Sequence, residues 1–426
     1  MKILVIGSGG REHAIVWAIK QSGKDVEVFC ANGNAGIAEI AECVPISPTD
    51  VQSLANFAEA NEMDLTFVGG ETSLALGVVD EFEKRGLRIV GASKKAAQLE
   101  SSKAFAKDFM ARHNIPTASY AKAGSAAEAI EILESGKFGN EEAAVVVKAD
   151  GLAAGKGVVV ASNRTEAISA INAMVSGEMI DPSAAETIVL EECLAGEEVS
   201  VLMFADGKDF TLMPPTRDHK RVGEGDTGAN TGGMGAITDS ALLSPEQKKT
   251  IQEEIIKPTL RGAEIDGFPF KGILFLGLMM TGDGAKVLEY NVRFGDPETQ
   301  AILVNLETSF IEICEAICDQ TLDKMIIAWK EGCSACVILA AENYPKDPRK
   351  GDAINGLAEA EKLENTVVFH AGTAKDADGN FITAGGRVLA VTASASSISN
   401  AIHRAYKGVN EISFEGMQFR RDIGKS

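Results

Sequence analysis

The sequence predicts an α/β protein with three parts. Over the first part of the chain, short apolar runs alternate with helical segments, which is the pattern of an open parallel sheet with helices on its faces. In the middle, glycine-rich loops connect apolar strands in a two-lobed region, and the last part mixes strands and helices again. A chain of 426 residues is long enough for two to four domains. We predict an N-terminal domain at 1–101, a central region at 102–328 with a mobile lobe at about 120–190, and a small C-terminal α/β domain at 329–426.

The composition is that of an ordinary soluble protein, with 45% hydrophobic and 24% charged residues. A net charge of −20 argues against non-specific binding to nucleic acid, which needs clustered positive charge. The chain contains no apolar run long enough to span a membrane, and its first residues lack the pattern of a signal peptide. Seven cysteines, an odd number in apolar surroundings, fit a reducing compartment. We expect a cytoplasmic protein without nucleic-acid or membrane partners.

A glycine loop follows the first predicted strand, Ile3–Ile6, and leads into a helix. Amide groups at a helix N-terminus bind anions, and Arg11 adds a positive charge beside this loop. A dinucleotide site is not indicated, because Glu12 stands where the third glycine of the GxGxxG fingerprint belongs. The loop therefore suggests a general anion site, and the alternative is a tight turn that serves packing only.

A second glycine loop, 150–157, lies between predicted strands at 143–149 and 158–161. It is not a Walker A loop, because Gly157 replaces the Ser or Thr that would hold magnesium. A loop between two strands can still wrap phosphates with its backbone amides, and its glycines can act as hinges of a lid. Lys148 lies on the strand that enters the loop. The alternative is an ordinary long hairpin.

A third stretch, 273–300, contains two predicted strands, and the second carries polar side chains beside an apolar core. Residues i, i+2 and i+4 of a strand share one face, so Glu289, Asn291 and Arg293 project from one surface. A carboxylate and a carboxamide suit Mg²⁺, which completes its shell with phosphate and water. Two alternatives are a polar, solvated strand face and a structural ion pair between Glu289 and Arg293.

Two further predictions concern a loop and a helix cap. The segment 214–239 is long, glycine-rich and polar, which indicates a functional loop, with disorder as the alternative. Asp296 and Pro297 predict the N-cap and the first-turn proline of a helix.

The run from Arg293 to Gln300, Arg-Phe-Gly-Asp-Pro-Glu-Thr-Gln, preceded by Glu289 and Asn291, resembles the signature of the phosphoribosylamine–glycine ligase family. This family belongs to the ATP-grasp superfamily, and the resemblance extends over nearly the whole chain. It implies an ATP-grasp central region and an ATP-dependent carbon–nitrogen ligase of de novo purine biosynthesis. Such an enzyme joins glycine to 5-phospho-β-D-ribosylamine through glycyl phosphate and releases ADP and phosphate. The alternatives are another ATP-grasp carboxylate–amine ligase and a non-catalytic nucleotide-binding module.

The resemblance also implies roles for individual residues, which we carry over position by position. ATP is expected at Lys103, Lys148, Gly151, Gly155, Gly157, Glu191, Leu194 and Glu198. The small-molecule substrates glycine and phosphoribosylamine are expected at Gly9, Gly10, Arg11, Glu71, Asp218, Asn230, Arg293 and Asp296, of which Arg293 and Asp218 are the expected catalytic residues. Glu289 and Asn291 are expected to hold Mg²⁺ or Mn²⁺. A monomer or a weak homo-oligomer is expected.

Some positions depart from the patterns of these families. Gly70 and Ala229 stand where the ligase family usually has proline, and Arg217 stands where it tends to have glutamine. Gly277 occupies a strand position at which many ATP-grasp enzymes place a further acidic metal ligand, and the ligase family shares this absence. Glu289 and Asn291 are therefore the protein ligands expected for the metal.

Overall fold

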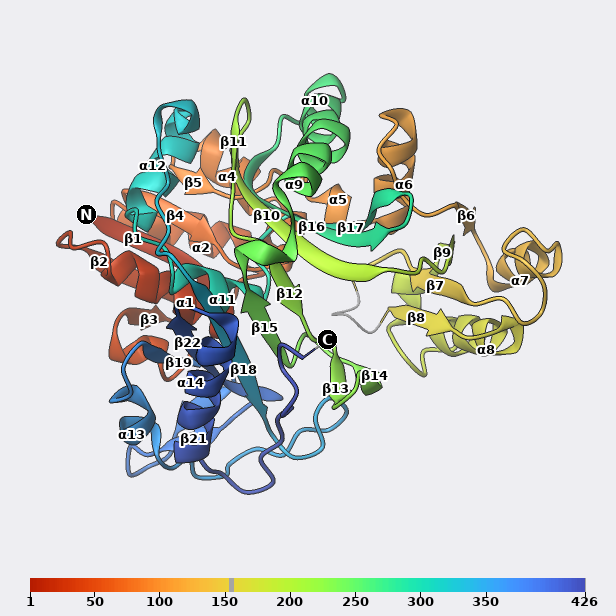
Figure 1. Ribbon diagram of the computed structural model, residues 1–426. Coiled ribbons are helices and arrows are strands. Elements are labelled where there is room, and N and C mark those ends of the chain that lie inside the picture. The colour runs from red at the N-terminus through yellow and green to blue at the C-terminus, as the bar shows by residue number, and fades with distance from the viewer. Residues whose placement is uncertain (153–156, 426) are drawn as a thin grey trace.

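The computed structural model describes residues 1–152 and 157–425, and its N-terminal part is an open parallel sheet (Figure 1). The strand order is β3-β2-β1-β4-β5, and every pairing is parallel. The strands are β1 (Lys2–Gly7), β2 (Glu27–Asn32), β3 (Glu42–Val44), β4 (Leu65–Val68) and β5 (Ile89–Val90). The prediction of an open parallel sheet is confirmed.

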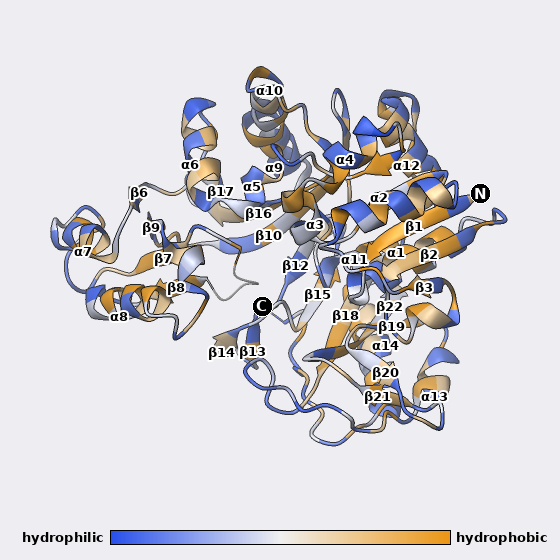
Figure 2. Ribbon diagram, turned by 180° about the vertical axis from the view of Figure 1, so that it is seen from behind, coloured by the Kyte–Doolittle hydropathy of each residue, from blue (hydrophilic) through white to orange (hydrophobic). Residues whose placement is uncertain are grey.

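Helices cover both faces of this sheet, because successive side chains of a strand point to opposite sides. On β1, Ile3 and Val5 are buried in the same cluster as apolar residues of α1 (Gly10–Lys20). Leu4 and Ile6 are buried in a second cluster with residues of α2 (Val51–Ala60) and α4 (Val78–Lys84). The hydrophobic colouring of β1 and β2 in Figure 2 shows the result, a sheet that is apolar on both faces.

A nine-stranded antiparallel sheet forms the centre of the molecule. Its order is β17-β16-β10-β12-β15-β18-β22-β19, and β11 pairs with β10. The strands are β10 (Glu197–Asp206), β11 (Phe210–Leu212), β12 (Thr216–Asp218), β15 (Gly235–Thr238), β16 (Lys271–Thr281), β17 (Gly284–Asn291), β18 (Cys333–Ala340), β19 (Thr366–His370) and β22 (Arg387–Ala395). Strands from both sides of residue 329 thus share one sheet, in which β15 pairs with β18.

A small lobe projects from this body, as Figures 1 and 2 show. Its four-stranded sheet has the order β6-β9-β7-β8, and it has a hydrophobic core of its own. The strands are β6 (Tyr120–Ala123), β7 (Val145–Ala149), β8 (Val158–Ala161) and β9 (Ile188–Glu192), and the helices are α7 (Ala126–Glu134) and α8 (Arg164–Val175). The lobe spans 120–192, which is close to the range of about 120–190 that was predicted to move.

The described chain also contains further α-helices and two separate hairpins. The other helices are α3 (Glu71–Leu76), α5 (Gln98–Ser101), α6 (Lys103–Arg112), α9 (Pro245–Ile251), α10 (Lys257–Ile265), α11 (Glu298–Leu303), α12 (Phe310–Asp319), α13 (Leu357–Glu361) and α14 (Ile398–Glu411). Two hairpins pair β13 (Arg221–Gly223) with β14 (Thr227–Asn230) and β20 (Thr373–Lys375) with β21 (Phe381–Thr383). Within residues 1–152 and 157–425, no helix combines the length and the apolar character that crossing a membrane requires.

Two local predictions were wrong. The segment 214–239 is not one long loop, because it contains four short strands, two of which, β12 and β15, belong to the central sheet. These strands have three and four residues, which is too short for a clear alternation of apolar and polar side chains. Asp296 is not the N-cap of α11, since Pro297 occupies that position. The Asp296 carboxylate instead accepts a hydrogen bond from Gln300 Nε2 at 2.8 Å.

Candidate active site

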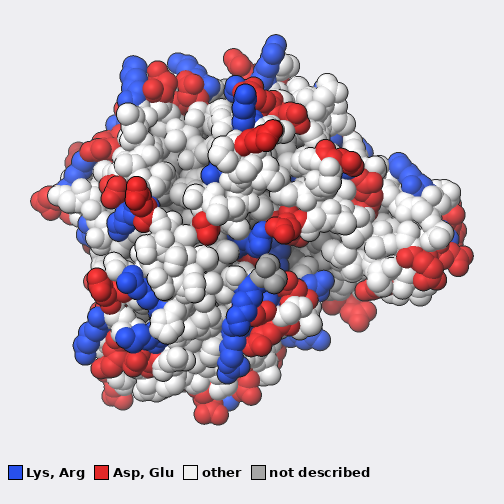
Figure 3. Space-filling model, in the orientation of Figure 1, with Lys and Arg blue, Asp and Glu red and all other residues white. Residues whose placement is uncertain are grey.

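Charged side chains gather where the lobe meets the body. Figure 3 shows lysine and arginine beside aspartate and glutamate at the hollow between the two parts. One direct link is Lys148 on β7, whose ammonium group donates to the backbone oxygen of Leu288 on β17 at 3.1 Å. The candidate site therefore takes groups from the lobe sheet, from the central sheet and from the N-terminal domain.

On the lobe side, Glu191 is held between two lysines. Its Oε1 atom lies 2.7 Å from Lys148 Nζ, and its Oε2 atom lies 2.8 Å from Lys107 Nζ. All three side chains are almost fully buried. Burial lowers the pKa of Lys107 to about 8, although Glu191 acts in the opposite direction. The Glu191 side chain is thus turned to the lysines, and its expected contact with ATP stays a prediction.

Lys103 stands at the entrance to the second glycine loop. It begins α6, whose N-cap Ser102 accepts a hydrogen bond from Phe105 N at 3.1 Å. Lys103 Nζ donates to the Gly151 oxygen at 3.3 Å. Burial lowers the pKa of Lys103, and Glu289 opposes this shift.

The glycine loop itself is described only at its ends. A side chain at Gly151 would place its Cβ atom 2.9 Å from the backbone of Ala184, so this close passage requires glycine. The Gly157 oxygen accepts a hydrogen bond from Ala149 N at 2.8 Å. Gly155 lies outside the described residues.

On the body side, Glu71 lies between two arginines. Its Oε2 atom is 3.2 Å from Arg293 Nε and 4.0 Å from Arg11 Nη1. Burial would raise the pKa of Glu71, but the two guanidinium groups outweigh it and hold this pKa at about 2. Arg293 Nη2 also pairs with Glu100 Oε1 at 2.8 Å. The structure thus brings together Arg11, Glu71 and Arg293, as the site prediction requires.

Between the two clusters lie Glu289 and Asn291, one strand step apart on β17. The buried Tyr290 points to the opposite side, where its hydroxyl lies 2.8 Å from Thr259 Oγ1. Burial raises the pKa of Glu289, but Lys220, Lys148, Lys103 and Arg293 together lower it below the usual range. Glu289 is therefore ionised at neutral pH, and its carboxylate with the Asn291 carboxamide forms an oxygen donor set that fits a hard divalent cation.

The neighbouring strand leaves room for Glu289. Gly277 on β16 pairs with it across the sheet, and a Cβ atom at Gly277 would lie 3.2 Å from Glu289 Cγ. Arg293 donates to Asn291 Oδ1 at 3.3 Å, while its ion pairs within the described residues are with Glu71 and Glu100. The alternative of a structural Glu289–Arg293 pair is therefore not what the structure contains.

A second set of charged side chains, with Lys220 at its centre, lies near Glu289. Lys220 Nζ lies 2.9 Å from Glu198 Oε2. Burial opposes its charge, yet Asp218, Glu198 and Glu289 raise the pKa of Lys220 well above its usual value. Burial raises the pKa of Asp218. Burial and the nearby Asp218 carboxylate together raise the pKa of Glu298 to about 7. Asp218, Glu198 and Glu289 are thus gathered around one lysine.

The first glycine loop lies at the edge of a separate cavity of about 380 Å³. Its lining comes from four segments, namely the loops at 8–9 and at 33–34, Asp296, and residues between 371 and 387 near the C-terminal hairpin. Asn34 Nδ2 joins two of them, because it donates to the backbone oxygens of Ser8 and His370 at 2.9 Å each. Gly9 and Asp296 therefore line one cavity, as their joint assignment to substrate predicts.

Glu12 explains why this loop is not a dinucleotide site. Its buried carboxylate accepts from Gly9 N and from Arg11 Nε at 2.6 Å each. A Cβ atom at Gly7 or Gly69 would overlap with the Glu12 side chain. Glu12 thus fills the space beside the loop and takes the amide of Gly9, which leaves the following turn of α1 and Arg11 for an anion.

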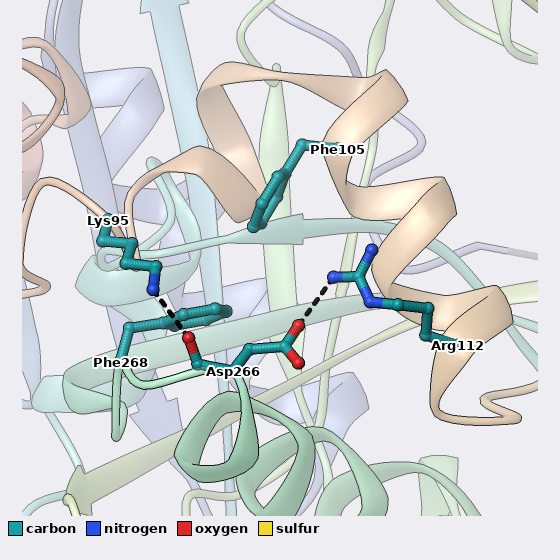
Figure 4. A pocket seen from close by; sticks show the side chains of 5 residues that line it. All are labelled: Lys95, Phe105, Arg112, Asp266 and Phe268. Atoms are coloured by element: carbon teal, nitrogen blue, oxygen red, sulfur yellow. Dashed lines mark hydrogen bonds and ion pairs between the residues drawn. The ribbon is translucent and has the colours of Figure 1, made fainter.

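Another pocket, of about 280 Å³, lies on the surface beside α6 (Figure 4). It is lined by Lys95, Phe105, Arg112, Asp266 and Phe268. Asp266 Oδ2 pairs with Arg112 Nη2 at 2.6 Å, and Lys95 Nζ donates to the Asp266 backbone oxygen at 2.6 Å. None of the predicted site residues lines this pocket, and its polar groups are already engaged with one another.

The remaining predicted residues and the three departures lie at the rim. Leu194 and Asn230 are half-buried. Arg217 Nη2 pairs with Glu197 Oε2 at 2.7 Å, so the departure at 217 makes a contact of its own. Ala229 is exposed on β14, and Gly70 precedes α3 with Arg11 Nη2 3.4 Å from the position of a Cβ atom.

Four charged residues of the site were missed by the sequence analysis, namely Lys107, Lys220, Glu100 and Arg387. A signal existed for Lys107, since it follows Lys103 by four residues and shares its helix face. Lys220 was visible as the second residue after Asp218, a spacing that places both on one side of an extended chain. Glu100 and Arg387 meet Arg293 and Asp296 only through the fold, and no local pattern marks them.

Solved structures of low identity share the whole fold. The biotin carboxylase of Campylobacter jejuni, solved as a β,γ-ATP complex, superimposes with a TM-score of 0.70 at 17% identity, covering 98% of this chain and 92% of that one. An N5-carboxyaminoimidazole ribonucleotide synthetase from Thermotoga maritima gives a TM-score of 0.63 at 17% identity, covering 97% and 99%. The fold and the sequence match to an ATP-grasp domain model over residues 101–299 place the chain in the ATP-grasp class of proteins.

The family follows from closer relatives. The phosphoribosylglycinamide synthetase models match along the chain, with the N domain at 1–100, the ATP-grasp domain at 101–299 and the C domain at 334–426. The phosphoribosylamine–glycine ligases of Pasteurella multocida and Haemophilus influenzae are each 47% identical over the whole chain and 97% and 98% of their own lengths. The crystal structure of the ligase from Thermotoga maritima has a TM-score of 0.85 at 33% identity, with both chains fully covered. The chain belongs to the phosphoribosylamine–glycine ligase family.

Proposed function

We propose that this protein joins glycine to 5-phospho-β-D-ribosylamine with cleavage of ATP to ADP and phosphate, as a step of purine biosynthesis. The observation that carries the proposal is the full-length similarity to ligases of this name, combined with one site in which cations from the lobe and the body face Glu289 and Asn291. Phosphoryl transfer needs positioning and charge neutralisation more than covalent help, and these residues provide both.

The chemistry divides into two steps. A glycine carboxylate oxygen attacks the γ-phosphorus of ATP, so that a new P–O bond forms while the bond to the β–γ bridging oxygen breaks and ADP leaves. The ribosylamine nitrogen then attacks the carbonyl carbon of glycyl phosphate, phosphate leaves with the electron pair of the C–O bond, and the nitrogen loses a proton. Lys103 and Lys148 lie on the side proposed for the ATP phosphates, and Arg293 is proposed to hold the glycine carboxylate.

A divalent cation is part of the proposal, and Glu289 and Asn291 would hold it. Mg²⁺ or Mn²⁺ held by these oxygens would supply positive charge to the phosphate groups. The fit rests on the ionised, half-buried Glu289 and on the carboxamide one strand step away. Gly9, Gly10, Arg11 and Asp296 are proposed to bind phosphoribosylamine at the cavity beside the first glycine loop.

We also propose a cytoplasmic protein that acts as a monomer or a weak homo-oligomer, without nucleic acid or membrane. The support for the compartment is that all seven cysteines are free thiols and most of them are buried.

The test is phosphate release with ATP, Mg²⁺, glycine and freshly generated phosphoribosylamine, with each component omitted in turn. The expected result is release that requires both glycine and the ribosylamine. Equal turnover with bicarbonate or D-alanine as acceptor would instead point to another ATP-grasp ligase, and nucleotide binding without acceptor-dependent release would point to a binding module.

A further inference from the structure

A strap near the end of the described chain, residues 418–425, lies against the hairpin 221–230 formed by β13 and β14. Figures 1 and 2 both show the C-terminus beside these two strands. The hairpin directly follows Asp218 and Lys220, and it ends at Asn230. It therefore carries or adjoins several residues proposed to meet the substrates.

The strap is fixed to the body at both of its ends. Gln418 and Ala340 exchange backbone hydrogen bonds of 2.9 and 2.8 Å, which continues β18 by one bridge. Ile423 is fully buried in the C-terminal core, and its amide donates to Tyr406 Oη at 3.1 Å. The residues between these anchors are thus held in one place.

Between the anchors, Arg420 reaches into the hairpin. Although it is an arginine, it is only 1% exposed. Its Nη1 atom donates to Asp226 Oδ1 at 2.7 Å and to the Arg221 oxygen at 3.2 Å. Its other nitrogens donate to Asp422 at 2.8 and 2.7 Å, and Asp422 Oδ2 accepts from Gly225 N at 2.8 Å. The buried guanidinium of Arg420 therefore links the strap to β13 and to the turn that connects β13 with β14.

A further contact reaches the site segment itself. Lys220 lowers the pKa of Glu289, and Glu289 raises that of Asp218, whereas His219 between them is buried on the side of the strap. Gly424 N donates to His219 Nε2 at 3.2 Å, and the His219 backbone is fixed to Gly235 and Met234. The alternation of an extended chain thus places the strap directly behind the residues that face the site.

We propose that Arg420 is a positioning residue, which acts through the hairpin 221–230 to hold Asp218, Lys220 and Asn230 in place for the acceptor substrates. This inference rests on the proposed function. The lysines proposed for ATP lie on α6 and β7, which make no hydrogen bond or ion pair with the strap within the described residues. Of the residues proposed for ATP, Glu198 is linked to this segment, through its ion pair with Lys220. Loss of Arg420 therefore affects glycine and ribosylamine more than ATP.

The test compares Arg420→Gln with Arg421→Gln in the full chain. Arg421 is the matched control, because its side chain is 74% exposed and its ion pair with Glu224 is long, at 3.8 Å. For Arg420→Gln we expect KM for glycine or ribosylamine to rise by about tenfold, with KM for ATP within about twofold. Amide exchange over 221–230 should become faster, while peptides of β6 and β9 on the lobe stay unchanged. Arg421→Gln should change none of these.

A milder variant guards against simple misfolding. Asp226 is 70% exposed and has a positive φ of 53°, which asparagine tolerates, so Asp226→Asn removes one partner of Arg420 without disturbing the core. It should shift acceptor KM and hairpin exchange in the same direction by a smaller factor, about threefold. A loss of stability alone would lower the active fraction and leave every KM unchanged.

Unchanged exchange over 221–230 in both variants, or faster exchange with unchanged acceptor KM, would overturn the positioning role. If the unsubstituted chain releases no phosphate with glycine and ribosylamine, the proposed function fails on its own, and the exchange rates still decide whether the strap holds the hairpin.

Discussion

Glu191 on the lobe side of the site and Glu71 on the body side are both held between two cations, but the cations differ. Glu191 meets two lysines, and all three side chains are at most 7% exposed. Glu71 meets two arginines, and it is 30% exposed. Lysine is a point charge on a flexible stem whose pKa shifts when it is buried, whereas the arginine fork stays charged. The lobe cluster, Glu191 with Lys107 and Lys148, can therefore change its charge near neutral pH. The body cluster, Glu71 with Arg11 and Arg293, cannot.

The pKa shifts support this contrast. The pKa of Lys107 falls to about 8, because burial outweighs the effect of Glu191. For Arg293, burial acts in the same direction, but Glu100 and Glu71 outweigh it and the pKa is raised. A fixed charge suits the side where a substrate carboxylate is proposed to bind. The other side is proposed to meet ATP, whose phosphates would replace Glu191 as the partner of the two lysines.

Replacing Glu289, which lies between the clusters, should have the largest effect. Glu289→Gln keeps the size of the side chain but removes the charge that balances both groups of cations. We expect turnover to fall by about 100- to 1000-fold and the Mg²⁺ dependence to shift to higher concentration. The measurements are a Mg²⁺ titration of phosphate release and the melting temperature. An unchanged titration with a depressed melting temperature would contradict a metal role.

Glu191→Gln breaks the lobe cluster and should have the largest effect on stability. It leaves Lys107 and Lys148 buried without their carboxylate, and breaking a buried pair in this way costs about 3–5 kcal/mol. Chemical denaturation monitored at the lobe would measure the loss. Glu192→Gln serves as a control, since this side chain is 38% exposed and its neighbouring cation Lys286 is 3.7 Å away. A loss no greater than that of the control would remove the distinction between the clusters.

Glu71→Gln breaks the body cluster and should cost less, about 1 kcal/mol, because the side chain is partly solvated and Arg293 keeps Glu100. The direction in which this stability contribution changes with pH follows from the pKa of Glu71, which is lowered to about 2. The contribution of Glu71 is complete above its ordinary pKa of 4.5 and is lost as pH falls toward 2. Denaturation at pH 7 and pH 3 should therefore show a smaller difference between variant and parent at the lower pH. A larger difference at pH 3 would contradict this origin.

Glu298 is a fourth carboxylate, and no ion pair of the described residues includes it. Its replacement should therefore have the smallest effect, with a pH dependence opposite to that of Glu71. Burial raises its pKa to about 7, so the folded state keeps a proton that the unfolded chain has released. The stability of the parent therefore declines as pH rises from about 4.5 to about 7. The melting temperature of Glu298→Gln relative to that of the parent should be higher at pH 8 than at pH 5. The exposed control Glu246→Gln should show no such difference. An equal difference at both pH values would contradict a raised pKa.

The sequence was sufficient for features that depend on local pattern. The parallel N-terminal sheet, the strands around 273–293 and the shared face of Glu289 and Asn291 follow from periodicities of apolar and polar residues. The clusters could not be predicted in this way, because Glu191 meets Lys107 over 84 positions and Glu71 meets Arg293 over 222. Whether an acid near a basic residue is solvated or clamped depends on burial, which only the packed fold determines. The roles of the site residues remain predictions.

The pairing of β15 with β18 has a consequence for how the chain can be cut and how it is made. A fragment that stops before Cys333 would leave the backbone groups of β15 without their partner strand, and a fragment that begins there would leave the matching edge of β18 bare. Unpaired strand edges are templates for aggregation. We therefore expect either piece alone to precipitate, and the two together to recover solubility. During synthesis, the central sheet cannot close at this position until the ribosome has delivered β18.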